Sequence, residues 1–427
     1  MAVGLMLILP MGGCSDNSPT KNASEKPVPD VEIWVHQHAP LVNWLKDKAA
    51  RYNLENTEAH VIIRAFPSGQ LPEKVYTAIK GDMGPAAFDF LCLNYKSLVD
   101  KEIIAPVDWK IMGYESETQF SSQWFKTAIE GVREKDGQFY ALPYTGNTWS
   151  LFINQEHFRK AGLDPATDAP KTWEDLANIA RKLTVRDEDG KLVRKGFDLP
   201  FSKADHWWSF VWGPVLSQCG GSVLSSDGTK ATINEKAAVD SLQVFYDLVH
   251  RYKVTEAGLA VDESEDFKNG LSSMWVSGVW SKTTFKGRDI ENKYMAVPLP
   301  QIDVNNRRTI IGGYWWHVSN KVDKKIQQQA WKFLNYITSE PGDQFGATGL
   351  LMPKPSIMDS KAWKEWPYHE VFSIDLAAGQ WPVSSPVYPQ IEKAIADAME
   401  RSLISDVSPQ MSLDIAAKAI DKALKEH

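Results

Sequence analysis

The sequence predicts an α/β protein of two bodies, and three observations support this fold class. Its 427 residues, 43% hydrophobic and 24% charged, suffice for two soluble cores. Near the amino terminus, strand-like runs alternate with helical periods in the order β-α-β-α-β, which is typical of an open parallel sheet covered by helices. Further on, residues 139–165 hold two strand-like runs joined by a Pro/Gly break with no polar loop, which indicates an extended segment passing between two bodies.

The leading elements carry polar residues where a ligand would bind. We expect strands at 31–35, 61–63 and 88–93, and helices at 41–52 and 71–79. In open parallel sheets, ligands bind beyond the carboxyl ends of the strands. The side chains at these ends that suit a polar ligand are His36, His38, Asn94 and Tyr95. Structural hydrogen bonding is an equally good role for either histidine, and the further ligands that a metal ion would need are missing.

The later elements follow local signals. Thr172 and Asp175 form the pattern of a capping box, which predicts a helix that runs to Leu183. A charged stretch, 186–195, is typical of a hairpin, and strands are expected at 294–300 and 310–318. Two more helices are expected at 326–338 and from about 412 to 424.

The first fourteen residues resemble an export signal. Residues 5–9 are apolar but too few to span a bilayer, which needs about 20. The sequence Met11-Gly12-Gly13-Cys14 resembles a bacterial lipobox, which predicts lipidation of Cys14, although no Lys or Arg precedes the apolar run. Residues 15–29 contain almost no apolar side chains and are expected to form a flexible tether. The alternative is a frayed apolar terminus.

Composition excludes several classes of function. A net charge of −7 does not fit a nucleic-acid binder, and no Cys/His spacing of a zinc site occurs. No catalytic serine, zinc-protease or phosphate-loop motif is present, and no pair of carboxylates stands beside the aromatic positions, so an enzyme is not expected. Nor is a cofactor. The 17 Trp, 13 Tyr and 17 Phe exceed what cores commonly need, which permits aromatic platforms in a cleft.

Four motifs, in order along nearly the whole chain, resemble one known family. The first extends from Ala141-Leu142-Pro143 to the helix after Thr172, and the second ends in Gly278-Val279-Trp280. The third combines Pro298-Leu299-Pro300 with Gly312-Gly313-Tyr314, and the fourth is the last helix. Together they resemble the extracellular solute-binding proteins of bacterial ABC importers, in the maltose-binding-like family 1, which are often lipoproteins.

This resemblance implies the two-lobed periplasmic-binding-protein fold of type II, with a ligand cleft between the lobes and three crossings of the chain. We expect crossings near 144–146, 296–300 and 338–341. Lobe 1 would comprise 30–143 and 300–338, and lobe 2 would comprise 147–296 and 341–427.

The resemblance also implies a function. The protein would capture a sugar or oligosaccharide by hinge closure and deliver it to a membrane permease, as a monomer held outside the cytoplasm by a lipid anchor. Alternatives are a non-sugar solute (a polyol phosphate, a polyamine or a peptide), a role as the partner of a membrane sensor and, last, a secreted carbohydrate-active enzyme.

The family pattern adds candidate ligand residues at the hinge and in both lobes. Asn147 aligns with a ligand-contacting carboxylate of the maltose-binding protein, and Phe210 aligns near one of its stacking tyrosines. The remaining candidates are Thr145, Trp208, Trp280, Tyr314 and Trp381. Turn chemistry is the alternative role for Asn147, and core packing is the alternative for each tryptophan. Trp207 and Trp212 are expected to pack inward.

Overall fold

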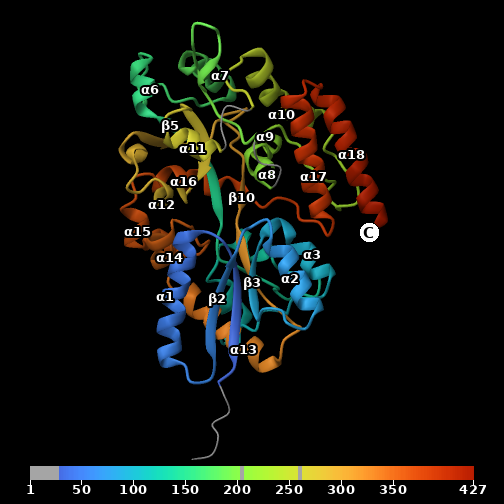
Figure 1. The fold of residues 1–427 in the computed structure, drawn as a ribbon. Helices are drawn as coiled ribbons and strands as arrows, with labels where there is room; N and C mark the ends of the chain where they lie inside the picture. Colours follow the sequence, from blue (N-terminus) through green and yellow to red (C-terminus); the bar gives the residue numbers. More distant parts are fainter. Residues whose placement is uncertain (1–27, 202–205, 258–261) are drawn as a thin grey trace, which may run out of the picture.

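The computed structural model describes residues 28–201, 206–257 and 262–427, so the predicted signal segment, Cys14 and most of the tether lie outside the described residues. The chain forms two lobes, one above the other in Figure 1. The lower one, lobe 1, contains the blue amino-terminal elements, and the upper one, lobe 2, contains the carboxyl-terminal helices. The predicted two-lobed α/β fold is thereby confirmed. No helix among the described residues is long and apolar enough to cross a membrane.

Lobe 1 is built on a five-stranded sheet in the order β2-β1-β3-β11-β4. Its strands are β1 (Asp30–His36), β2 (His60–Phe66), β3 (Ala87–Leu91), β4 (Leu142–Pro143) and β11 (Tyr314–Val318). The first three strands are parallel, as predicted, and β11 is antiparallel to both of its neighbours. The helices of this lobe are α1 (Ala39–Glu55), α2 (Leu71–Lys80), α3 (Tyr95–Asp100), α4 (Glu117–Ser121), α5 (Lys126–Glu130) and α13 (Lys324–Thr338).

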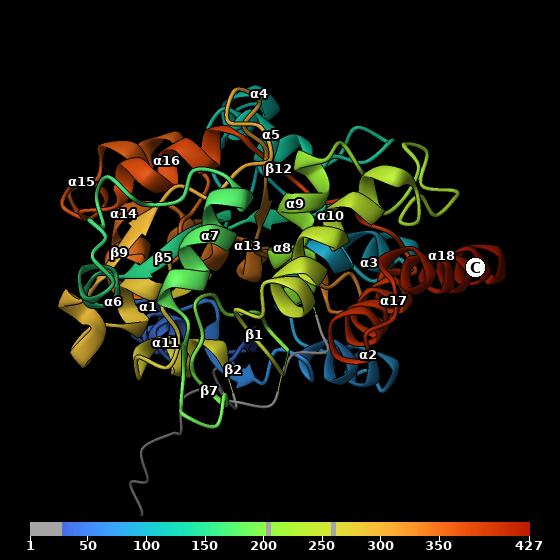
Figure 2. The same cartoon turned by 90° about the horizontal axis from the view of Figure 1, so that it is seen from above.

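Lobe 2 is organised around β5 (Asn147–Asn154), in which all eight residues are buried. One edge of β5 pairs with β10 (Thr309–Gly312) and then β9 (Tyr294–Val297), and the other edge pairs with β8 (Met274–Gly278). β12 (Gly379–Gln380) extends the sheet beside β10. Seen from above, α14–α16 lie on one side of β5, and α17 and α18 lie on the opposite side (Figure 2).

The helices of lobe 2 largely follow the predicted pattern. They are α6 (Gln155–Lys160), α7 (Trp173–Leu183), α8 (Trp207–Val211), α9 (Gly213–Gln218), α10 (Lys236–Tyr246), α11 (Glu263–Lys268), α12 (Ser281–Thr284), α15 (Lys361–Lys364), α16 (His369–Ala377), α17 (Tyr388–Met399) and α18 (Pro409–Glu426). The capping box at Thr172 is confirmed. The charged hairpin is confirmed as well, between β6 (Val185–Arg186) and β7 (Leu192–Arg194).

The second crossing lies later in the chain than the sequence predicted. The prediction placed it at 296–300, but β10 is paired with β5 and therefore belongs to lobe 2. The next strand, β11, belongs to the sheet of lobe 1, so the chain passes between the lobes at Gly312-Gly313-Tyr314. The first crossing falls between β4 and β5, over residues 144–146.

The third connection is made through α14 (Pro341–Thr348), which contacts both lobes. Its Asp343 accepts a hydrogen bond from Nε1 of Trp44 on α1 (2.9 Å). Its Phe345 packs edge-on against Trp363 in the core of lobe 2, with ring centroids 5.1 Å apart. This helix therefore lies at the junction of the two lobes.

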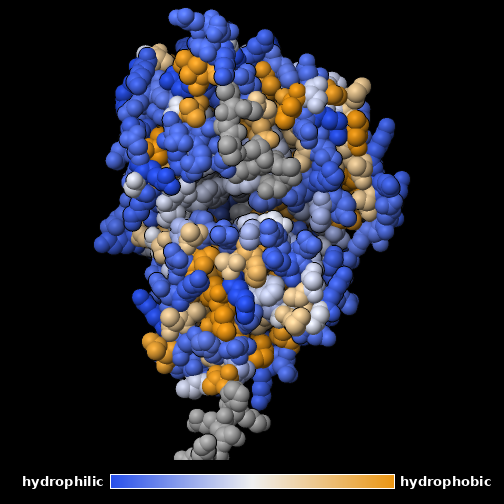
Figure 3. Space-filling view, in the orientation of Figure 1, coloured by the Kyte–Doolittle hydropathy of each residue, from blue (hydrophilic) through white to orange (hydrophobic). Residues whose placement is uncertain are grey.

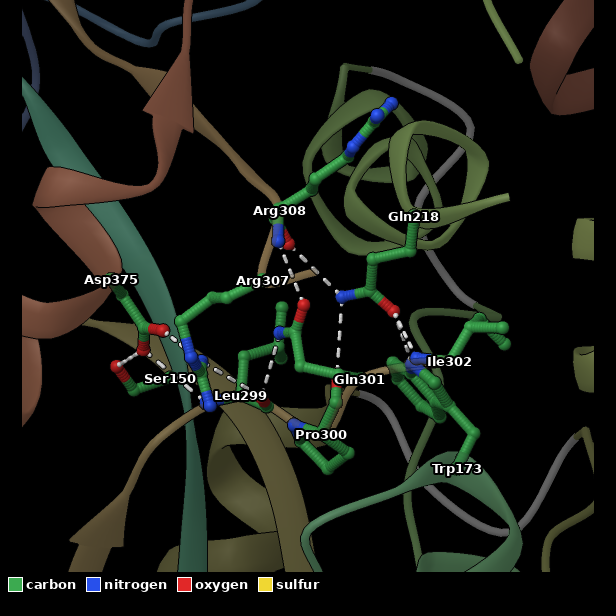
Figure 4. A network of polar contacts seen from close by, with 10 residues as sticks. All are labelled: Ser150, Trp173, Gln218, Leu299, Pro300, Gln301, Ile302, Arg307, Arg308 and Asp375. Carbon is green, nitrogen blue, oxygen red and sulfur yellow. Dashed lines mark hydrogen bonds and ion pairs between the residues drawn. The ribbon is translucent and has the colours of Figure 1, made fainter. Parts of the chain in front are cut away.

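A polar network in lobe 2 fixes the loop that leads into β10 and the second crossing (Figure 4). The buried carboxylate of Asp375 accepts hydrogen bonds from Ser150 (2.7 Å) and from the guanidinium of Arg307 (2.7 Å). Gln218 binds the same loop through the carbonyl oxygens of Pro300 and Arg308. Because the loop is held at both ends, the start of β10 has a fixed position relative to β5.

Candidate functional site between the lobes

A cavity of about 250 Å³ lies between the lobes where the first two crossings meet. Its lining comes from both lobes: His36, Gln37, His38, Ser68, Leu91, Asn147, Trp149, His206, Trp207, Phe210, Trp280, Gly312, Gly313, Tyr314 and Leu350. A second cavity, of about 480 Å³, shares Ser68, Leu91, His206 and Tyr314 with the first. The two cavities therefore adjoin and form one cleft, and Figure 3 shows the surface hollowed at this level.

The wall from lobe 2 is a cluster of four aromatic rings. Trp149, on β5, stacks on Phe210 of α8 with centroids 4.4 Å apart and planes at 6°. Trp280 packs edge-on against Trp149 (5.6 Å) and also against Trp207 (5.8 Å). Such clusters present broad apolar faces, and each ring fixes the orientation of the next.

Two glycines make room for these rings. A Cβ atom on Gly278 would lie 2.0 Å from the ring of Trp280, and one on Gly312 would lie 2.1 Å from the ring of Phe210. Both distances are far below any real contact, so a side chain at either position would displace the aromatic wall. The Gly-x-Trp spacing around Val279 thus has a steric cause in this protein.

The facing wall, from lobe 1, is polar. His36, at the end of β1, bonds through Nδ1 to Asp89 (2.6 Å), and its ring stacks on Tyr314 with centroids 3.6 Å apart. Burial, with a smaller effect from His36, lowers the pKa of His38 to about 4, so this ring is neutral at pH 7. The Nδ1 atom of His38 is buried and has no partner among the described residues. Buried polar side-chain atoms are nearly always hydrogen-bonded, so this unpaired nitrogen is an exception in the wall of the cavity.

Two polar residues at the first crossing, Thr145 and Asn147, have different roles. Asn147 lines the cavity, and its Oδ1 accepts a hydrogen bond from the amide of Leu351 (3.2 Å). Thr145 is fully buried, and its hydroxyl oxygen accepts a hydrogen bond from the amide of Tyr314 (2.6 Å). Thr145 therefore ties the first crossing to the second and does not face the cleft.

The structure brings together most of the side chains predicted from the sequence. Those that line the main cavity are His36, His38, Asn147, Phe210, Trp280 and Tyr314. Asn94 lines the adjoining cavity. These positions meet because the carboxyl ends of β1 and β3 face the start of β5 across the two crossings.

Four predicted residues lie elsewhere, each for a visible reason. In addition to Thr145, Tyr95 is buried in the core of lobe 1, where its hydroxyl donates to the carbonyl of Val132 (2.9 Å). Trp208 is 4% exposed and does not line the cleft. Trp381 packs against Trp315 and a separate cavity of about 200 Å³, and its Nε1 donates to a carbonyl of lobe 1 (3.0 Å). It therefore bridges the lobes outside the main cleft.

Three ring-bearing side chains of the cleft were not predicted as ligand residues from the sequence. Trp207 was expected to pack inward, but it lines the cavity while its neighbour Trp208 is buried. Trp149, near the start of β5, is only 3% exposed but lines the cavity. His206 lies just before α8 and also lines the cavity. The alternation of sides along β5 placed Asn147 and Trp149 on one face, and this was the signal that could have identified Trp149.

The described lining of the main cavity contains no lysine, arginine, aspartate or glutamate. The adjoining cavity has one lysine, Lys80, together with Glu73, Asp89 and Glu392. Within the described ranges, no group of three side chains is placed to hold a metal ion. The main cavity is therefore a neutral, aromatic and hydrogen-bonding surface, and the charged side chains lie in the adjoining cavity.

Known proteins resemble the chain over nearly its full length. The sequence model named "Bacterial extracellular solute-binding protein" matches residues 38–344. Among curated relatives, the sn-glycerol-3-phosphate-binding periplasmic protein UgpB of Escherichia coli (strain K12) is 22% identical over 424 residues, which cover 93% of either chain.

Solved structures share the fold at low sequence identity. The GacH receptor of Streptomyces glaucescens, studied unliganded and with acarbose, superposes with a TM-score of 0.80 at 19% identity, covering 94% of this chain and 100% of that one. An ABC transporter solute binding protein of Thermotoga lettingae bound with α-D-tagatose gives 0.78 at 22% identity, covering 93% and 100%. Since the family model spans well over half of the sequence, this chain belongs to the bacterial extracellular solute-binding proteins, as its motifs indicated.

Proposed function

We propose that this protein is the solute-capturing component of an ABC importer, and that the cleft closes on a neutral sugar or oligosaccharide for delivery to the membrane permease. The observation that carries the proposal is the pairing of an aromatic wall on lobe 2 with a polar, uncharged wall on lobe 1. A sugar presents apolar C–H faces and a rim of hydroxyl groups, and it needs both kinds of surface.

Closure follows from the origin of the two walls. Trp280 and Trp207 belong to lobe 2, whereas His36 and Tyr314 belong to lobe 1. A solute that contacts both walls gains contacts only when the lobes approach, so it shifts the balance between open and closed forms by that difference in contacts. Recognition of this type requires no reaction, and we propose that the protein is not an enzyme.

The second candidate is a polyol phosphate, because the full-length relative UgpB is named for binding sn-glycerol-3-phosphate. A phosphate group is recognised by Arg, Lys or a cluster of backbone amides. The main cavity has no such cation among its described residues, and Lys80 in the adjoining cavity stands among carboxylates. The lack of a lysine or arginine in the main cavity therefore favours a neutral solute over a phosphate.

A thermal-shift screen of purified residues 28–427 against mono- and oligosaccharides, glycerol 3-phosphate and polyamines tests the proposal. A sugar at 100 times its dissociation constant should stabilise the protein by about 2.7 kcal/mol. Trp280→Ala should remove this shift. The matched control is Trp34→Ala, which truncates a half-buried tryptophan of lobe 1 outside the cleft and should keep the shift. A response to glycerol 3-phosphate or a polyamine, with none to any sugar, would refute the proposed solute class.

We also propose that the mature protein is a monomer outside the cytoplasm, held at the membrane by a lipid on Cys14. The lipobox-like sequence before Cys14 and the polar residues 15–29 support this anchoring. A tether of this composition would let the two lobes reach the permease while the anchor stays in the membrane.

A further inference from the structure

One buried carboxylate beside the cleft has a position that the capture of a solute does not by itself explain. Asp89 on β3 is fully buried. Its Oδ1 accepts a hydrogen bond from the backbone amide of His36 (2.8 Å), and its Oδ2 contacts Nδ1 of the same histidine (2.6 Å). The hydroxyl of Tyr144, at the first crossing, donates to that same Oδ2.

The ring of His36 is thereby fixed from two directions. Asp89 holds one edge, and Tyr314, at the second crossing, covers one face with its ring plane at 11°. An ionised carboxylate can only accept hydrogen bonds, so the imidazole nitrogen that contacts it carries a proton. The hydrogen-bonding role of the other nitrogen is then determined as well.

That other nitrogen, Nε2, faces the cleft. His36 lines the main cavity, and its Nδ1 edge is occupied by Asp89. Nε2 has no hydrogen-bond partner among the described residues, and it does not belong to the fully enclosed unpaired atoms. In neutral His36 it therefore carries a lone pair that a solute can reach.

We propose that Asp89 is a positioning residue that determines which hydrogen-bonding groups the cleft accepts. By keeping the proton on Nδ1 of His36, it makes Nε2 an acceptor, and this acceptor selects a solute with an O–H or N–H donor at that point. A sugar hydroxyl meets the requirement, whereas a phosphate dianion, which offers only acceptors, does not. This inference rests on the proposed function, and it identifies a residue that would determine the specificity of the cleft.

The tautomer of His36 can be measured without a solute. Two-bond ¹H–¹⁵N correlation spectra of the uniformly ¹⁵N-labelled protein distinguish a protonated from an unprotonated ring nitrogen, and His36→Gln identifies the signals. Near neutral pH we expect a protonated Nδ1 and an unprotonated Nε2. In Asp89→Asn, the amide group placed at Oδ2 donates to Nδ1, so the two nitrogens should exchange roles.

Tyr144→Phe is the matched control. It removes the other donor to the same carboxylate oxygen but leaves the bond between Asp89 and His36, so the tautomer should stay as in the wild type. If Asp89→Asn does not fold, the wild type and Tyr144→Phe still decide the question. A protonated Nε2 in the wild type, either alone or together with Nδ1, would overturn the proposal because the nitrogen facing the cleft would then be a donor.

Adding a sugar provides a second readout of the same atom. At saturation with maltotriose, or with the sugar that stabilises the protein most, the Nε2 signal of His36 should shift as its lone pair accepts a hydrogen bond. A saturated sugar complex in which this signal does not move overturns the role in specificity. If no sugar binds while the tautomer is as expected, the proposed solute class fails and the positioning by Asp89 stands.

Discussion

Replacing Gly313 with alanine should separate the first two crossings, because nothing larger than a hydrogen atom fits between them. A Cβ atom at this position would lie 2.1 Å from the carbonyl oxygen of Thr145 and 2.5 Å from its hydroxyl oxygen. To restore the 3.4 Å at which ordinary contact begins, the crossings must part by about 1.3 Å. Strain of this kind costs about 1–3 kcal/mol in a packed interior.

Parting the crossings also weakens the hydrogen bonds between them. The amide of Tyr314 donates to the hydroxyl oxygen of Thr145 at 2.6 Å, and the amide of Thr145 donates to the carbonyl of Tyr314 at 3.2 Å. If both bonds are lost at about 1 kcal/mol each, the total loss in the free energy of unfolding, with the strain included, is roughly 3–5 kcal/mol. Urea unfolding followed by tryptophan fluorescence measures this loss.

Gly346→Ala is the control for that experiment. Gly346 lies within α14, and a Cβ atom there meets its nearest neighbour, on Ala362, at 3.4 Å. This helical substitution should leave stability unchanged or raise it slightly, since alanine favours a helix more than glycine does. If the free energy of unfolding of Gly313→Ala lies within about 0.5 kcal/mol of the wild-type value, the crossings do not approach as closely as described, and the reasoning is refuted.

Two further predictions concern the network in lobe 2 and the amino terminus. Burial raises the pKa of Asp375 to about 6, and an unfolded aspartate titrates near 4. Between these values the native protein holds more protons than the unfolded chain. The stability of the wild type relative to Asp375→Asn should therefore fall by roughly 2 kcal/mol as pH rises from about 4 to 6. A difference in stability that does not change with pH would contradict this. Cys14→Ser should move the protein from the membrane to the soluble fraction of the producing bacterium, and an unmodified wild-type terminus in mass spectra would rule out the anchor.

Local sequence patterns predicted the helices and strands that are determined by neighbouring residues. Strand β1 and helix α1 follow an apolar run and a helical period, and the helix after Thr172 follows its capping box. The second crossing was misplaced because β10 has only four residues, and its partner β5 lies far away in the sequence. No local period distinguishes a strand of lobe 2 from one of lobe 1 when the deciding pairs are that distant.

The same limit applies to the candidate site. His36 and Asn147 could be predicted because His36 ends β1 and Asn147 begins β5, and the ends of strands gather at the cleft. Trp207 and Trp208 could not be told apart, because α8 has only five residues and its packing decides which ring is buried. Tyr95 directly follows Asn94 beyond the end of β3, yet the turn that begins at Cys92 directs the side chain of Tyr95 into the core.

The complete burial of β5 has a consequence for hydrogen exchange. Its amides pair with strands on both edges, and the strand continues directly from the hinge at Gly146. Such amides exchange with solvent only when the whole sheet opens, whereas the short connection before them has few bonds to lose. Movement of the lobes would therefore leave the slowest exchanging amides of lobe 2 untouched. Any protection that a solute adds would be concentrated in the few residues of the crossings and in the cleft loops.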